Sequence, residues 1–169
     1  IKISNSVFEN CVSLLEITIP NSVTKIGSNS FKGCKSLTKI IFSESIKTIG
    51  DNAFEGCSSL KVIDLQFSIK SIGKLSFAKC SSLTHVFVPS EIESIGLNSF
   101  NECSSLIMIS IPIRFTKESI GIEMKTTVID NEDDSISLCI FGYRFDVGKN
   151  VPVNKEEAVK YYKLAADKG

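Results

Sequence analysis

Cysteine is the residue type in this chain with the widest scope for chemistry, because a thiol can form a disulfide, bind a metal or attack a substrate. Five of the six cysteines share one spacing of 23 residues, at Cys11, Cys34, Cys57, Cys80 and Cys103. Side chains at one equivalent position of a repeat stack as a ladder with rungs roughly 4.8 Å apart, whereas a disulfide needs Cβ atoms about 3.8 Å apart. Zinc needs four ligands around one point, which a straight ladder does not provide. We therefore expect five buried, unpaired thiols that bind no metal and pack as small apolar side chains.

The single histidine, His85, is the other candidate for chemistry. We expect it on the outward side of a strand, with Asp64 one rung below and Thr84 next to it. A Ser/His/Asp site needs a nucleophile within hydrogen-bond reach of the histidine and an oxyanion hole. Thr84 is not evidently aimed at His85, and the sequence has no phosphate-binding glycine loop and no pair of carboxylates that stands out. We therefore predict no enzymatic activity and no cofactor, and we interpret His85 as a surface residue.

The cysteine spacing belongs to a larger repeat over residues 1–111. Phenylalanine precedes each of the five cysteines by three residues, Ser-Leu follows, and then comes a pattern of the type Leu-x-x-Ile-x-Ile. A fixed period of this length is typical of a solenoid, in which a unit buries its apolar face only by stacking on its neighbours. The predicted fold class is an α+β repeat solenoid: a leucine-rich-repeat array with parallel concave strands and a 23-residue period, followed by an αα-hairpin.

Each segment of the unit has an expected role. The pattern Leu-x-x-Ile-x-Ile, as in residues 14–19, predicts a strand with three inward apolar side chains and outward x positions. The recurring Ile-Gly pair is expected to form a turn, because glycine tolerates dihedral angles that a Cβ atom forbids. The segments around Phe31 and its equivalents are expected to form 3₁₀ or short helical turns. After Pro112 the period fails, and we expect residues 112–130 to be a degenerate closing repeat, since a terminal repeat lacks one neighbour.

The pattern changes to a helical period after residue 130. The acidic run of residues 131–134 suits the start of a helix, with an acidic interaction tail as the alternative. Two apolar stripes between about 134 and 147 predict a helix buried on two sides. A second helix is expected after Asn154, an N-cap with Glu157 three residues on. Its apolar stripe consists of Ala158, Tyr161, Tyr162, Ala165 and Ala166. We expect this hairpin to dock on the end of the array near residues 112–130, with Gly142 allowing the helices to approach closely.

The outward side of the concave strands is the expected binding surface. Several of its side chains are more apolar than a solvated sheet requires, and large exposed apolar patches usually mark an interface. The alternative is that β-branched and aromatic residues simply favour strands. The candidate partner-binding residues are Ile41, Val62, His85, Phe87, Ile107 and Met108. Phe87 is the expected central anchor, and as an outward residue it should tolerate Phe87→Ala with little change in stability.

Composition restricts the kind of partner more than it restricts the compartment. The formal net charge is zero, so the sequence gives no electrostatic case for nucleic acid or an anionic membrane. No apolar run approaches the roughly 20 residues needed to span a bilayer. The chain begins inside a repeat, at Ile1 and without Met, and we expect it to continue into further repeats or domains. Free thiols, and ten asparagines of which none begins an Asn-x-Ser/Thr acceptor, favour a reducing, cytoplasmic compartment.

Two family resemblances follow from these motifs. The pattern Ile-Gly-x-x-(Ala/Ser)-Phe-x-x-Cys-x-Ser-Leu-x-x-Ile-x-Ile-Pro closely resembles the BspA-type leucine-rich repeat of bacterial surface proteins and parasitic protists. The tail from Ser137 to Gly169 resembles a single Sel1-like repeat, a TPR-like adaptor unit, although Phe141, Phe145, Asn150 and Asn154, like Ser137, depart from the family's usual residues. The resemblances imply two domains, 1–130 with BspA-type repeats and 131–169 with the Sel1-like repeat.

The BspA-type resemblance implies surface adhesion or host-protein binding without enzymatic activity. The leading hypothesis is therefore a protein-binding module at a cell surface that uses its concave sheet. The alternative is an intracellular scaffold within a larger multidomain protein. Sequence beyond the two ends would distinguish them, because a signal peptide or membrane span favours the first and a cytosolic domain such as a kinase favours the second.

Overall fold

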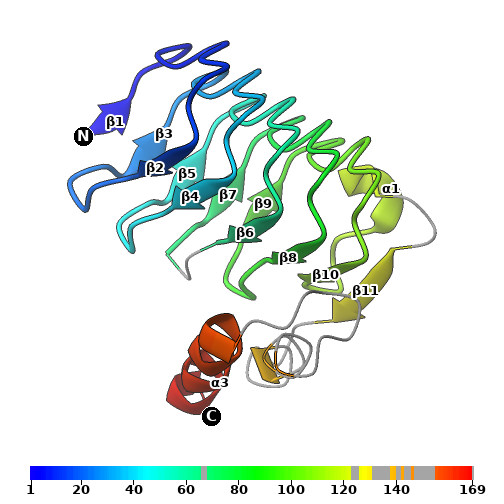
Figure 1. The fold of residues 1–169 in the computed structure, drawn as a ribbon. Coiled ribbons are helices and arrows are strands. Elements are labelled where there is room, and N and C mark those ends of the chain that lie inside the picture. Colours follow the sequence, from blue (N-terminus) through cyan, green and yellow to red (C-terminus); the bar gives the residue numbers. More distant parts are fainter. Residues whose placement is uncertain are drawn as a thin grey trace.

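The chain folds as a parallel β-solenoid of about five turns (Figure 1), in a computed structural model that describes residues 1–65, 68–122, 126–130, 138, 139, 142, 146 and 155–168. Each turn advances the sequence by 23 residues, as the pairing of Ile17 with Ile40 and of Ile63 with Val86 shows. The predicted solenoid and its period are thus confirmed. Among the described residues, no helix is both long enough and apolar enough to cross a membrane.

The first row of strands is the one predicted from Leu-x-x-Ile-x-Ile. It consists of β2 (Glu16–Thr18), β4 (Lys39–Ile41), β6 (Val62–Asp64), β8 (His85–Phe87), β10 (Met108–Ile111) and β11 (Thr127–Asp130). β2 pairs with β4, and β6, β8, β10 and β11 form a four-stranded parallel sheet. The inward residues of β6, β8 and β10, which are Ile63, Val86 and Ile109, are fully buried, whereas Ile17 on β2 and Val128 on β11 are partly buried. This row therefore presents one face to the core and one face outward.

A second row of strands was not predicted. It is a five-stranded parallel sheet of β1 (Lys2–Ile3), β3 (Lys25–Ile26), β5 (Thr48–Ile49), β7 (Ser71–Ile72) and β9 (Ser94–Ile95). Here the expectation of a turn at Ile-Gly is wrong: the isoleucine ends a two-residue strand, and the glycine follows it. A Cβ atom on Gly73 would lie 2.5 Å from the Asp51 backbone nitrogen. Glycine is needed because the preceding turn approaches closely, and not because of an unusual dihedral angle.

The phenylalanine segments are hydrogen-bonded turns and not the expected 3₁₀ or short helical turns. Their rings stack at intervals of 5.0 to 5.5 Å along the array, in the order Phe8, Phe31, Phe54, Phe77 and Phe100. Two positions per turn have positive φ. The first is occupied by Ser6, Asn29, Asn52, Leu75 and Asn98, and the second by Asn10, Gly33, Gly56, Lys79 and Glu102. Asparagine and glycine recur there because they tolerate the left-handed region best.

The array closes with a helix in place of a sixth two-residue strand. α1 (Lys117–Ile120) begins 23 residues after β9 begins, and Thr116 caps it by accepting a hydrogen bond from the Ser119 backbone N–H at 3.2 Å. The Ile120 carbonyl accepts a hydrogen bond from the Phe100 backbone N–H at 2.9 Å, so α1 provides a partner for a backbone donor of the last turn. Arg114 donates to the carbonyls of Ser90 and Ile92 at the same edge. The second sheet therefore ends at β9, while the first continues to β11.

Of the expected αα-hairpin, the structure describes one complete helix, α3 (Lys155–Lys168). The first helix, expected from about 134 to 147, and the N-cap Asn154 lie largely outside the described residues. Gly142 does permit a close approach, because a Cβ atom there would lie 2.7 Å from the Tyr162 ring. α3 itself packs against Phe87 on β8 and Met108 on β10. The first helix, which is the part of the hairpin expected to contact residues 112–130, lies largely outside the described residues, so that docking place stays a prediction. A two-sided apolar helix predicts a partner surface but does not specify which one.

Candidate binding surfaces

The strand face, which we define as the outward side chains of β2, β4, β6, β8 and β10, is the predicted binding surface. The parallel register aligns these side chains in columns across the turns. In the two-stranded sheet, Glu16 aligns with Lys39 and Thr18 with Ile41. In the four-stranded sheet, one column is Val62, His85 and Met108, and the next includes Phe87 and Ser110. Outward neighbours therefore come from residues 23 apart, and one continuous surface is formed by five different segments of the chain.

Helix α3 covers the half of the strand face that lies on β8 and β10. Ala158, Tyr161 and Ala165 lie one helical turn apart and pack on Phe87 and Met108, with Leu138 in the same cluster. Phe87 is 1% exposed and Met108 is fully buried. The expectation that these two residues form an exposed partner site is therefore wrong, and so is the expectation that Phe87→Ala is mild. Their apolar character is explained by contact with this chain's own helix.

His85 is also buried, at 1% exposure, so its interpretation as a surface histidine is wrong as well. It lies in register between Val62 on β6 and Met108 on β10. The sequence places it on an outward strand position, which is correct, but the face at that position is not open to solvent. A buried imidazole at this place has no access to a solvent-borne substrate.

The other half of the strand face is open. Glu16, Thr18 and Lys39 are exposed, and Ile41, in register with Thr18, is 46% exposed. Val62 and Ile107 are half-buried. We call Glu16, Thr18, Lys39 and Ile41 the open half of the strand face. Of the six predicted site residues, therefore, Ile41 is available to a partner, Val62 and Ile107 are partly available, and the other three are covered.

The cysteine column is structural, with a feature that spacing alone does not show. Each buried thiol donates to a phenylalanine carbonyl of the preceding turn: Cys34 to Phe8 at 3.1 Å, Cys57 to Phe31 at 3.2 Å, Cys80 to Phe54 at 3.3 Å and Cys103 to Phe77 at 3.2 Å. All six cysteines are free, and burial of these four is confirmed. Cys11, in the first turn of the array, is exposed, contrary to expectation.

Burial also makes these thiols unreactive. Desolvation and the neighbouring Cys34 raise the pKa of Cys57 to about 12, and desolvation raises the pKa of Cys80 well above its usual value. The thiolate is the reactive form, so the column has little capacity for nucleophilic chemistry. Because the S–H donors give cysteine a packing role in any compartment, the free thiols no longer support a cytoplasmic location.

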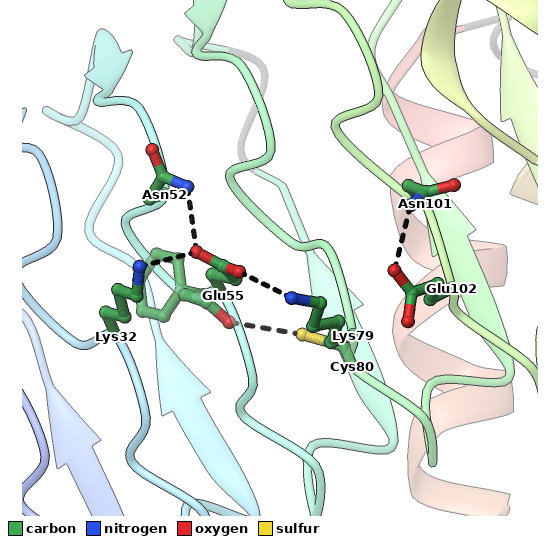
Figure 2. Close-up of polar contacts among 8 residues, drawn as sticks. Lys32, Asn52, Glu55, Lys79, Cys80, Asn101 and Glu102 are labelled. Atoms are coloured by element: carbon green, nitrogen blue, oxygen red, sulfur yellow. Dashed lines mark hydrogen bonds and ion pairs between the residues drawn. The ribbon is translucent and has the colours of Figure 1, made fainter.

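The sequence reasoning missed a charged cluster centred on Glu55. Figure 2 shows its carboxylate between two lysines of other turns: Lys32 Nζ lies 2.9 Å from one oxygen, and Lys79 Nζ lies 3.1 Å from the other. The Asn52 amide donates to the same carboxylate at 2.8 Å. Lys32 and Glu55 are 23 residues apart, so opposite charges at one repeat position were the signal that could have found the pair.

The Glu55 carboxylate is held ionised. Burial by itself raises its pKa, but hydrogen bonds from Lys32, Asn52 and Lys79 outweigh that effect and lower the pKa to about 2 from its usual 4.5. The side chain of Glu55 is 12% exposed, whereas those of Lys32 and Lys79 are 39% and 54% exposed. A pKa this far below neutral is poorly matched to proton transfer at neutral pH. The cluster joins three consecutive turns of the array.

Comparison with known proteins identifies relatives of the array. Residues 1–127 match the family described as "BspA type Leucine rich repeat region", in 6 copies. The T. pallidum leucine-rich repeat protein TpLRR is 28% identical with a TM-score of 0.71, over 78% of this chain and 63% of that protein. A leucine-rich repeat protein from Bacteroides ovatus is 32% identical with a TM-score of 0.63, over 76% of this chain and 39% of that protein.

A third structure, the pneumococcal vaccine antigen PcpA, shares the fold at 20% identity and a TM-score of 0.58, over 70% of this chain and 31% of that protein. The chain thus spans less than two thirds of the length of each of these proteins. Comparison with curated protein sequences gives no match.

Proposed function

The chain belongs to the BspA-type leucine-rich repeat family, and from this premise we propose that it is a non-enzymatic protein-interaction module whose open half of the strand face binds an amphipathic helix of a protein partner. Leucine-rich repeat solenoids typically bind proteins and carry no catalytic centre. The proposed contact residues are Glu16, Thr18, Lys39 and Ile41, with Val62 at the border.

The docking of α3 is the observation that carries this proposal. A helix with a small–aromatic–small stripe, Ala158, Tyr161 and Ala165, already lies on the same face two turns further along the array. The strand face is therefore shaped to accept helices. Its open half offers an apolar side chain, Ile41, in register with Thr18 and next to the aligned acidic and basic pair of Glu16 and Lys39. A partner helix with an apolar stripe flanked by charges of both signs fits this surface.

The setting that we propose is a cell surface, where the module would adhere to a host protein. The support is the family resemblance to BspA-type surface proteins. We also propose that residues 131–169 form a Sel1-like repeat and a second domain, which is supported by the helical stripe of α3. An adaptor of this type would place a second protein-binding element next to the array.

The test is a matched pair of isoleucine substitutions. Ile41→Ser removes the apolar side chain of the open half, while Ile113→Ser changes an isoleucine that is 68% exposed elsewhere in the chain. Proteins are captured from host-cell surfaces with the wild-type chain, and the affinity of each identified partner is then measured for all three proteins. Loss of one buried apolar anchor at an interface costs about 1–2 kcal/mol, so Ile41→Ser should weaken binding about 5- to 30-fold. Ile113→Ser should bind like the wild type.

Thermal melts of the three proteins serve as the folding control. If Ile41→Ser melts like the wild type and binds every captured partner equally well, the open half is not the binding surface. If only Ile113→Ser weakens binding, the contact lies near the closing helix instead.

A further inference from the structure

The outward side of the second sheet carries a groove with a volume of about 450 Å³, which we call the lysine groove. Its lining residues come from all five strands β1, β3, β5, β7 and β9, so the groove runs along the solenoid axis and across the strands. It lies on a different sheet from the strand face, and α3 does not pack against it. The proposed function makes no use of this surface.

The groove follows from the glycine column. Cβ atoms on Gly50 and Gly73 would lie 2.7 and 2.5 Å from backbone nitrogens of the preceding turn, so close stacking excludes side chains there. The surface is therefore hollowed along a line where each turn would otherwise carry a side chain. Beside this line stand short hydroxyl side chains, those of Thr48, Ser71 and Ser94. These short side chains give the groove a shallow, polar floor.

Positive charge is concentrated at this groove although the chain as a whole is neutral. Lys2 and Lys25 line it at the first two turns, and Lys47 and Lys70 immediately precede the lining residues Thr48 and Ser71 in the next two. Lys2, Lys25 and Lys47 are exposed. Lys2 and Lys25 lie in the column that continues with Thr48 and Ser71, and Lys47 and Lys70 lie one residue earlier, in the adjacent column. Four consecutive turns, roughly 5 Å apart, therefore place one lysine each beside the groove.

The acidic groups near the groove do not cancel this charge. Asp51 lines the groove, and its Oδ1 atom accepts a hydrogen bond from the Lys74 backbone N–H at 2.8 Å. Glu93 is exposed one residue before Ser94, at the far end. The charged side chains beside the groove are thus basic over the first four turns, apart from Asp51 in the third, and acidic at the fifth. A linear anionic ligand would lie over the first four turns.

We propose that the lysine groove binds a linear acidic polysaccharide, with sulfate or carboxylate groups paired to Lys2, Lys25, Lys47 and Lys70, and sugar hydroxyls hydrogen-bonded to Thr48 and Ser71. A band of lysines that supplies one positive charge per turn matches a polymer with regularly spaced anions. The short hydroxyl side chains offer both donors and acceptors to sugar hydroxyls at the floor of the groove.

An acidic peptide fits the groove less well. Ile49 and Ile72 reach the groove only with their backbone, because their side chains are 1% and 2% exposed and point into the core. The groove therefore has no pocket for an apolar anchor residue. The inner strands β3, β5 and β7 are each paired with a neighbour on both sides, so their backbones are not available to add a peptide strand. The polar polymer is the better match.

The experiment measures binding of defined oligosaccharides by surface plasmon resonance. The probes are a heparin hexasaccharide, which is sulfated, a hyaluronan hexasaccharide, which is carboxylated, neutral maltohexaose, and poly-glutamate as the acidic peptide. We expect at least one acidic sugar to bind and maltohexaose not to bind. With two to four ion pairs, raising the salt from 50 to 200 mM should weaken binding about 10- to 80-fold.

Two double variants test the place of binding. Lys2→Ala with Lys25→Ala removes two groove lysines and should weaken binding on the order of 10- to 30-fold, at roughly fivefold per lysine. Lys35→Ala with Lys61→Ala removes the same charge from exposed lysines that do not line the groove, and it should leave binding unchanged. Ser71→Glu, which keeps all lysines, should also weaken binding by placing a carboxylate in the groove.

Three results would overturn the proposal. The first is that neither acidic hexasaccharide binds the folded wild-type chain. The second is that both double variants lose affinity equally, which would indicate net charge without a site. The third is that poly-glutamate binds as tightly as the sugars, which would favour a peptide ligand. None of these results bears on the open half of the strand face, since Ile41 is on the other sheet.

Discussion

Substitution of Phe87 by alanine provides a direct test of how α3 is held. Phe87 is 1% exposed in a cluster with Met108, Tyr161 and two alanines of α3, and this cluster is separate from the core of the array. Removing a fully buried phenylalanine costs about 3–5 kcal/mol when all of its contacts are lost. Phe87 also touches its neighbours on the sheet, so we assign about 2–3 kcal/mol of that loss to the docking of α3.

The assay is hydrogen exchange of the α3 amides, which reports the opening of this helix separately from global unfolding. A loss of 2–3 kcal/mol raises the population of the undocked state about 30- to 150-fold, so α3 amides should exchange faster by that factor. Amides of β3 and β5 should change little, because their side chains belong to the array core. Ile41→Ala, on the same face but half exposed, is the control and should leave α3 unchanged.

Exchange of α3 at the wild-type rate in Phe87→Ala would show that Phe87 does not hold this helix. Equal loss of protection in β3, β5 and α3 would show that the two clusters unfold as one unit.

Two further predictions concern the turns. Glu55→Gln should destabilise the array by about 1–2 kcal/mol in urea unfolding at pH 7, a value reduced for the exposure of the two lysines. The folded pKa of Glu55, about 2, is below its usual 4.5. The stabilisation by its ionised form is therefore complete above about pH 4.5 and is lost as the pH falls toward 2. Glu55→Gln should weaken the dependence of the unfolding free energy on pH in this range, and equal dependence in both proteins would contradict a stabilising role for the Glu55 cluster. Leu75 has φ of 53°, which costs a non-glycine residue about 1–2 kcal/mol, so Leu75→Asn should stabilise the chain by about 0.5–1 kcal/mol. The matched change Leu97→Asn, at an exposed leucine without positive φ, should bring no gain in the melting temperature, and a gain of equal size would refute the argument from φ.

Much of the array could be predicted because each local sequence pattern occurs in five copies, which makes its period evident. Phe54, Cys57 and Ile63 are buried where the period places them. The second sheet was missed since its strands are two residues long, too short for an alternating pattern to show. The glycine after each of these strands was assigned to a turn, because a sequence does not distinguish a glycine required by dihedral angle from one required by a close neighbour.

The candidate site could be predicted only in part. The outward columns follow from strand register, and Ile41 is open as expected. Whether an outward residue meets solvent depends on segments far away in the sequence, and Phe87 meets a helix that begins 68 residues later, at Lys155. No pattern around Phe87 contains that information.

The sequence by itself therefore determined the solenoid, its period and the inward columns, because stacking of identical units is enforced by residues within one period. The tertiary structure alone decided which outward surfaces remain free, since α3 covers Phe87 and Met108 and leaves Ile41 exposed. It also decided that Lys2 and Lys25 line one groove, with Lys47 and Lys70 next to its lining residues Thr48 and Ser71. The physical reason is that surfaces are made by contacts between turns and between distant segments, and those contacts depend on how the whole chain packs.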